Sequence, residues 1–179
     1  MKVIINRFAC GILEPINYIG YGTDRQEIIK NIQSLKKTHI FITAHHLFRI
    51  EHKFIKQLQT TAQLSFDVII VDEAQAIKNS QCMLINCLRP YKGTAWFLLM
   101  TGTPIQNNLS ELYSLLTLVD HNRFIDKVES EEAFNKKYSD IKNIKELKKI
   151  LRTYMIRRTK DVVCKDIPAC QQVRFPVLL

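Results

Sequence analysis

A run of β-branched residues that ends in two adjacent carboxylates constrains this chain more than any other feature. Residues 66–75 read Phe-Asp-Val-Ile-Ile-Val-Asp-Glu-Ala-Gln. The apolar part is too short for a typical helix and too continuous for a strand with one exposed face. It therefore predicts a strand buried on both faces of a parallel sheet, with helices above and below. Ligands of such sheets bind beyond the carboxyl ends of the strands, where Asp72 and Glu73 follow.

Two interpretations of Asp72 and Glu73 are possible from this segment alone. A hard cation such as Mg²⁺ binds one or two carboxylates and takes water and phosphate oxygens as its other ligands. A second carboxylate beside the cation can then orient or deprotonate an attacking water. The structural alternative is that acidic residues stabilise the start of the next helix through its dipole.

A second strand favours the chemical interpretation. Residues 94–100 read as another buried strand, in which we expect Trp96 to pack in the core, and Thr-Gly-Thr-Pro follows directly at 101–104. Gly102 permits a tight, closely approaching backbone, and the two threonines supply hydroxyl groups. Pro104 ends the strand. Two strands that deliver polar groups to one edge of a sheet are typical of a phosphate-handling site.

Composition limits the class of protein. The chain has 179 residues, of which 46% are hydrophobic and 24% charged, so it is globular and large enough for one core with an appendage. The net charge of +9 suits a polyanionic partner such as nucleic acid. The five cysteines include no C-x-x-C pair, which argues against zinc and for thiols in a reducing compartment. No apolar run is long enough to span a membrane, and the first residues make a poor secretory signal, so we expect an intracellular protein.

Strands and helices are expected to alternate until about residue 107 and to give way to helices after it. Expected strands cover residues 15–21, 39–43, 66–71 and 94–100, and expected helices begin at Thr23, Leu47 and Asn79 or Ser80. Later helices are expected to begin at Asn108, Ser130 and Asn143, before a last strand at 173–179. Asn108 and Glu111 have the spacing of a helix cap and its partner. The pattern predicts a helical subdomain attached to a parallel sheet.

Positive charge is concentrated near the end of the chain. Between residues 142 and 160 only Glu146 opposes the basic residues Lys142, Lys145, Lys148, Lys149, Arg152, Arg157, Arg158 and Lys160. This span either contacts phosphates or is a solvated helix face. His45 and His46 lack a neighbouring Cys, Asp or Glu cluster, so we expect ordinary surface or half-buried histidines there rather than metal ligands.

Three segments resemble motifs of the Swi/Snf-type chromatin-remodelling ATPases, which belong to helicase superfamily two. Residues 72–79, Asp-Glu-Ala-Gln-Ala-Ile-Lys-Asn, resemble their Walker B (DExx) box. Residues 101–116 resemble motif III and the helix after it, and residues 154–168 resemble the stretch that ends the first lobe. The three occur in the family's order and at similar spacing. Residues 111–116 and 138–141 look most like the one-like branch of the chromodomain-helicase-DNA-binding remodellers.

The resemblance implies an α/β fold, an incomplete RecA-like (P-loop NTPase) lobe with a parallel sheet, plus a helical subdomain. Residues 1–107 would form the partial lobe, 108–165 the helical subdomain, and 166–179 a returning strand or a linker to a second lobe. The sequence contains no G-x-x-x-x-G-K-[ST]. In the family that phosphate loop precedes the segment equivalent to Met1, and the second lobe follows the segment equivalent to Leu179. We therefore expect this chain to hold only the later part of one lobe.

The resemblance also assigns roles to individual residues. Asp72 would hold Mg²⁺ and Glu73 would polarise the water that attacks ATP. The residues expected to couple nucleotide state to lobe movement are Gln75, Thr101, Gly102, Thr103 and Gln106. Thr43 matches the first threonine of a segment that touches the nucleic-acid backbone. Charge adds the further nucleic-acid candidates Lys148, Lys149, Arg152, Arg157 and Arg158.

The implied activity is ATP hydrolysis coupled to translocation on duplex DNA, in chromatin and therefore in the nucleus. Its cofactors would be ATP and Mg²⁺, and its partners DNA or nucleosomes and the rest of a two-lobe motor, with no membrane. Whether these residues alone form an enzyme stays open because the phosphate loop is missing. One alternative is a non-catalytic DNA- or protein-binding module derived from a remodeller lobe. The other is an unrelated α/β enzyme that uses Asp72 and Glu73 with a metal, against which the motif III match argues.

Overall fold

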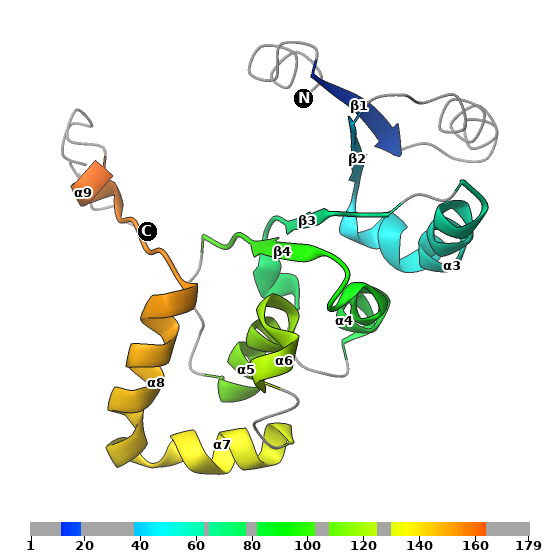
Figure 1. Ribbon diagram of the computed structural model, residues 1–179. Helices are drawn as coiled ribbons and strands as arrows, with labels where there is room; N and C mark the ends of the chain where they lie inside the picture. The colour runs from blue at the N-terminus through cyan, green and yellow to red at the C-terminus, as the bar shows by residue number, and fades with distance from the viewer. Residues whose placement is uncertain are drawn as a thin grey trace, which may run out of the picture. The chain divides into compact units, whose positions relative to one another are not determined.

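The chain divides into two compact units, Met1–Asp140 and Ile141–Leu179. The computed structural model describes residues 12–18, 38–62, 65–77, 82–102, 108–124 and 130–163. Strands and most helices lie in the first unit, and two helices form the described part of the second (Figure 1). The expected helix from Thr23 and the expected strand at 173–179 fall outside the described residues.

The strands form two parallel pairs. β1 (Leu13–Tyr18) pairs with β2 (Thr38–Thr43), with Leu13 opposite Thr38. β3 (Val68–Val71) pairs with β4 (Trp96–Leu99), with Val68 opposite Trp96. Parallel strand pairs in a chain that also forms helices confirm the α/β class expected from the sequence.

The helices of the first unit follow the sequence pattern closely. They are α3 (His45–Ala62), η1 (Ala74–Ala76), α4 (Met83–Leu88), η2 (Arg89–Tyr91), α5 (Leu109–Val119), α6 (His121–Phe124) and α7 (Glu131–Ser139). The expected cap of α5 is present, because the Asn108 side chain accepts the Ser110 N–H at 2.9 Å. Within the described ranges, no helix is both long and apolar enough to cross a membrane.

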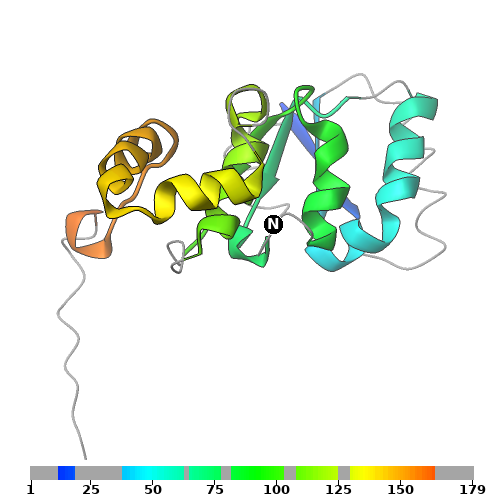
Figure 2. The ribbon, with the colours of Figure 1, turned by 90° about the horizontal axis from the view of Figure 1, so that it is seen from below.

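One face of the β3–β4 pair forms the main core. Val71 and Phe97 are buried against Leu84, Ile85 and Leu88 of α4 and Leu118 of α5. Both helices therefore cover the same face of these strands, as Figures 1 and 2 show from two directions. Alternation of side chains along a strand places Ile69 and Leu99 on this face too, and both are packed against the core.

The opposite face of β3–β4 is open, which corrects two expectations. Val68, Ile70, Trp96 and Leu98 are 50%, 59%, 60% and 38% exposed. The strand was expected to be buried on both faces, and Trp96 was expected in the core. Both expectations were wrong because α4 and α5 lie on the other face, and no described helix covers this one. An unbroken apolar run does not reveal which parts of the chain supply the second covering layer.

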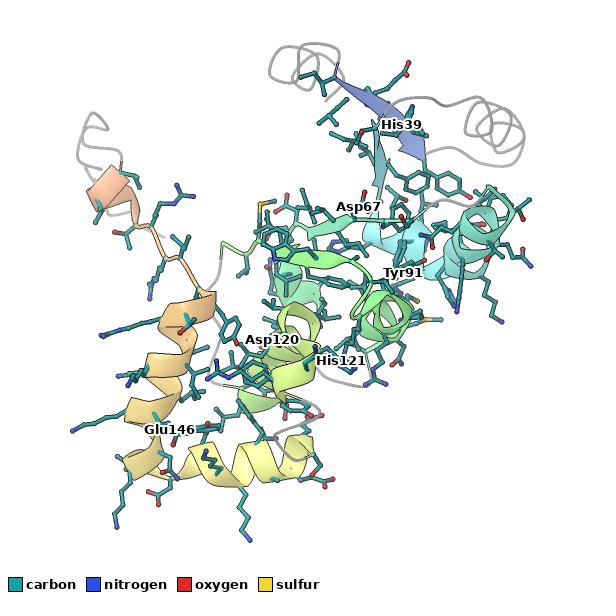
Figure 3. All side chains as sticks on the ribbon, viewed as in Figure 1. His39, Asp67, Tyr91, Asp120, His121 and Glu146 are labelled. Carbon is teal, nitrogen blue, oxygen red and sulfur yellow. The ribbon has the colours of Figure 1, made fainter. Side chains whose placement is uncertain are left out.

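A chain of aromatic rings connects the two strand pairs. Ring centroids are 5.2 Å apart for Tyr18–Phe41, 6.1 Å for Phe41–Phe66 and 5.7 Å for Phe66–Tyr91. The ring of Phe48, on α3, also packs on Tyr91, with the two centroids 6.4 Å apart. Tyr91 is labelled in Figure 3. These separations suit tilted aromatic packing, so the rings tie β1 and β2 to the segments around β3.

A second cluster joins α5 and α7. Phe134 is fully buried, with its ring 5.3 Å from Tyr113 and 4.7 Å from Tyr138. The Asn135 amide also donates to the Ser110 hydroxyl at 2.8 Å. Rings and amide together fix α7 against α5.

Two cysteines fall within the described residues, and both are free thiols. Cys87 is buried, and that burial raises the pKa of its thiol. Cys82 is half-buried, and its thiol lies 3.6 Å from the Ala76 carbonyl oxygen. The other three cysteines lie outside the described residues.

The second unit is described from α8 (Ile141–Tyr154) to α9 (Lys160–Val163). Leu147 is buried, whereas Lys145, Lys148, Lys149 and Arg152 are exposed. Figure 3 shows the long nitrogen-tipped side chains that stand out from α8 near the labelled Glu146. The unit therefore presents a cationic helix face to solvent.

Candidate functional site

Backbone hydrogen bonds hold the ends of β3 and β4 together. The Met100 N–H donates to the Val71 carbonyl at 2.8 Å, and the Ala74 N–H donates to the Met100 carbonyl at 2.8 Å. Val71 is 5% exposed and Ala74 is fully buried, so a buried residue lies on each side of Asp72 and Glu73. Asp72 and Glu73 are consequently fixed at the carboxyl edge of the strand pair.

Glu73 has an unusual backbone conformation. Its φ and ψ are 51° and 48°, in the left-handed region, and no other non-glycine residue in the described ranges has a positive φ. This conformation costs a residue with a Cβ about 1–2 kcal/mol. The Asp72 carboxylate accepts the Glu73 N–H at 2.9 Å, which helps to hold the turn. Strain of this kind persists only where the surrounding structure fixes it, and it occurs often at functional sites.

Three side chains continue from this turn as a hydrogen-bonded relay. The Gln75 amide nitrogen donates to the Glu73 carboxylate, and the Gln75 amide oxygen accepts the Thr101 hydroxyl at 2.6 Å. Glu73 and Gln75 follow β3, whereas Thr101 follows β4. The relay therefore joins the polar residues of two strands that are 26 positions apart in sequence.

The carboxylates at this edge suit a hard cation. Asp72 and Glu73 are exposed, and no group of three or more His, Cys, Asp or Glu in the described part of the chain could enclose a metal. Mg²⁺ does not need such a cage, because it keeps several waters and binds one or two carboxylates together with substrate phosphates. The donor set thus fits Mg²⁺ with a nucleotide and not a closed structural metal site.

Some of the residues expected to couple nucleotide state to lobe movement cannot be placed in the site. Thr103 and Gln106, like Lys78 and Asn79, lie outside the described residues. Gly102 is exposed, and a Cβ added there would meet nothing within 4 Å. The close backbone approach expected at Gly102 is therefore not seen among the described residues.

The expected nucleic-acid residues differ in accessibility. Thr43 ends β2, and its hydroxyl oxygen is buried with no hydrogen-bond partner among the described residues. In this conformation the hydroxyl is not presented to a partner. By contrast, all five basic candidates are exposed: Lys148, Lys149, Arg152, Arg157 and Arg158.

Sequence reasoning missed two elements of the site. The left-handed conformation of Glu73 has no sequence signal, because glycine or asparagine would normally mark such a position. The Met100 carbonyl, which accepts the Ala74 N–H, is a backbone group and leaves no trace in the sequence. Both depend on strands that meet only in the folded chain.

Comparison with known proteins identifies the family. The model of the SNF2-related domain matches residues 5–177. The chain belongs to the SNF2-related domain family. This result agrees with the family resemblance of the three motif segments in the sequence.

This chain is similar to curated proteins that include a chromatin-remodeling ATPase chain. It is 32% identical over 92% of its length to the chromodomain-helicase-DNA-binding protein 1-like of Danio rerio, and 32% identical over 96% to that of Mus musculus. It is 34% identical over 92% of its length to a probable chromatin-remodeling complex ATPase chain of Oryza sativa subsp. japonica. It covers only 15%, 18% and 14% of these three relatives.

Proposed function

We propose that this chain is the Walker B and motif III part of the first ATPase lobe of a chromatin remodeller. The observation that supports this most directly is the relay from Glu73 through Gln75 to Thr101 at the carboxyl edge of two parallel strands. In phosphoryl transfer, such an edge holds the metal and positions the attacking water. A relay to the next strand makes the position of Glu73 sensitive to any movement of Thr101.

In this proposal each residue has a distinct task. Asp72 would hold Mg²⁺, which would supply positive charge opposite the nucleotide phosphates. Glu73 orients and polarises the attacking water, and Gln75 fixes the Glu73 carboxylate. Thr101, with Gly102, Thr103 and Gln106, transmits the state of the nucleotide to the rest of the motor.

The whole motor would act on DNA or nucleosomes in the nucleus, using ATP. This part of the proposal rests on the family and on the names of relatives, of which the chain covers less than a fifth. The basic residues of α8 and of residues 155–159 would contact DNA phosphates, because they are exposed and nearly unopposed by acids.

A test of the catalytic assignment needs the other parts of a two-lobe motor. With this chain fused in frame to those parts, we expect Glu73→Gln to lower ATP turnover by orders of magnitude while ATP binding persists. The matched control is Asp67→Asn, which removes an exposed carboxylate at the opposite end of β3 (Figure 3). Near-normal turnover in Glu73→Gln, or an equal loss in Asp67→Asn, would refute the assignment.

A second function, a DNA-binding module without catalysis, is favoured by the exposed cations of α8. Binding of the 179-residue chain to duplex DNA should weaken with salt, with a log–log slope of about −0.9 per contacted phosphate. Lys148→Glu with Lys149→Glu should reduce affinity well beyond Lys53→Glu with Lys56→Glu, which changes charge equally on α3. Equal losses in both pairs would mean that net charge alone, and not the α8 face, determines binding.

A further inference from the structure

The linker between α8 and α9 is the most accessible segment in the described part of the second unit, residues 141–163. Residues 155–159, Met-Ile-Arg-Arg-Thr, belong to no helix or strand, and each is exposed. Ile156 is 88% exposed. Figures 1 and 2 show this linker as a drawn-out chain between the two helices. Accessible, non-helical backbone of this kind is what modifying enzymes require of a substrate segment.

The last residue of the linker, Thr159, carries a hydroxyl group. The Thr159 carbonyl accepts the N–H groups of Val162 and Val163 at 3.1 and 3.2 Å, which fixes its backbone. Its side chain is exposed, and the described residues offer its hydroxyl no hydrogen bond. Two exposed arginines, Arg157 and Arg158, directly precede it.

We propose that Thr159 is a phosphorylation site for a serine/threonine kinase that selects basic residues on the amino-terminal side of its target. Carboxylates in the substrate groove of such a kinase would pair with Arg157 and Arg158. The Thr159 Oγ attacks the γ-phosphorus of Mg·ATP, the bond to the bridging oxygen breaks, and ADP leaves. The hydroxyl proton passes to the catalytic base of the kinase.

The chain contains an internal comparison for this site. Ser139 lies two positions after the lysine pair Lys136 and Lys137, with Tyr138 between them, so basic residues also stand on its amino-terminal side. However, Ser139 ends α7, and its hydroxyl donates to the Asn135 carbonyl. A kinase would have to unwind α7 to reach it. Structure therefore separates Thr159 from a site that the sequence alone ranks beside it.

Phosphorylation of Thr159 would act on the proposed DNA-contacting surface, and this regulatory half rests on the function proposed above. A phosphothreonine carries about −1.5 to −2 charges at neutral pH. Its oxygens would pair with the neighbouring Arg157 and Arg158 in bidentate hydrogen bonds. Those two arginines would then be unavailable to DNA phosphates, so modification weakens DNA binding.

The modification is tested with the purified 179-residue chain. We treat it with the catalytic subunit of cAMP-dependent protein kinase and Mg·ATP and map phosphate by mass spectrometry. Thr159 should be the main site, Thr159→Val should abolish its signal, and Ser139→Ala should leave it unchanged. Brief trypsin treatment should cut after Arg157 or Arg158. Phosphate on Ser139 instead of Thr159, or resistance of the linker to trypsin, would overturn the proposal.

The regulatory half is tested by fluorescence anisotropy with labelled duplex DNA over a salt series. Loss of two phosphate contacts should reduce the magnitude of the log–log salt slope by about 1.8 and the affinity on the order of tenfold. Kinase-treated Thr159→Val is the control and should bind like the untreated chain. Equal binding with and without Thr159 phosphate would refute the regulation. If the untreated chain binds no DNA, the proposed DNA contact through the basic residues fails, while the mapped phosphate still decides the modification.

Discussion

At Glu73 we expect glycine to be more stable than alanine, which is the opposite of the order at an ordinary helical residue. A left-handed conformation costs a residue with a Cβ about 1–2 kcal/mol, and glycine does not incur this cost. Glycine also loses more backbone entropy on folding than alanine does. This loss offsets about 0.5–1 kcal/mol of the strain energy that glycine avoids. Both Glu73→Ala and Glu73→Gly remove the carboxylate that accepts from Gln75, so this loss cancels between them. We therefore expect the glycine variant to be more stable than the alanine variant by roughly 0.5–1 kcal/mol.

Urea unfolding followed by circular dichroism measures this difference. The control is Lys53, an exposed position inside α3, where glycine should be less stable than alanine by about 1 kcal/mol. The two positions should therefore rank glycine and alanine in opposite orders. If Glu73→Ala is as stable as Glu73→Gly or more so, the left-handed turn does not exist in solution, and the geometry of the relay must be reconsidered.

Three further predictions concern the relay, the helical cluster and one lysine. Thr101→Val removes the hydroxyl that donates to the Gln75 amide oxygen, so it should lower ATP turnover of a reconstituted motor more than ATP binding. The control Thr60→Val removes an exposed hydroxyl on α3 and should change neither turnover nor binding. Phe134→Ala should destabilise the first unit by about 3–5 kcal/mol in urea unfolding, and a loss below 1 kcal/mol would show that α7 is not packed on α5. Burial, with a smaller effect of Arg89, lowers the pKa of Lys92 from 10.5 to about 8. Between these values the unfolded chain binds more protons, so this group makes stability rise from pH 8 to pH 10.5. Lys92→Met should therefore raise the urea midpoint at pH 7 and flatten its rise toward pH 10, and an unchanged pH profile would contradict the burial of the amine.

Sequence by itself determined the fold class and the family. Short β-branched runs separated by helical periodicity predict parallel strands, because side-chain periodicity follows directly from backbone geometry. The motif segments at residues 72–79 and 101–116 indicated the family, and the match to the SNF2-related domain confirmed it. The cap of α5 at Asn108 was also readable, since capping depends on residues within one turn. The boundary expected at residue 107 stays a prediction, as do the functional roles of the site residues.

Tertiary structure decided which groups meet and which faces remain open. The relay from Glu73 to Thr101 exists because β3 and β4 lie side by side, and a hydrogen bond across 26 positions has no local signal. The open face at Ile70 and Trp96 contradicted what residue type suggested. Thr159 and Ser139 both follow basic residues, but Thr159 lies in an exposed linker, whereas the Ser139 hydroxyl is hydrogen-bonded at the end of a helix. Local sequence sets periodicity and caps because these depend on near neighbours. Exposure and long-range hydrogen bonds depend on how distant segments pack, and the folded chain alone determines that.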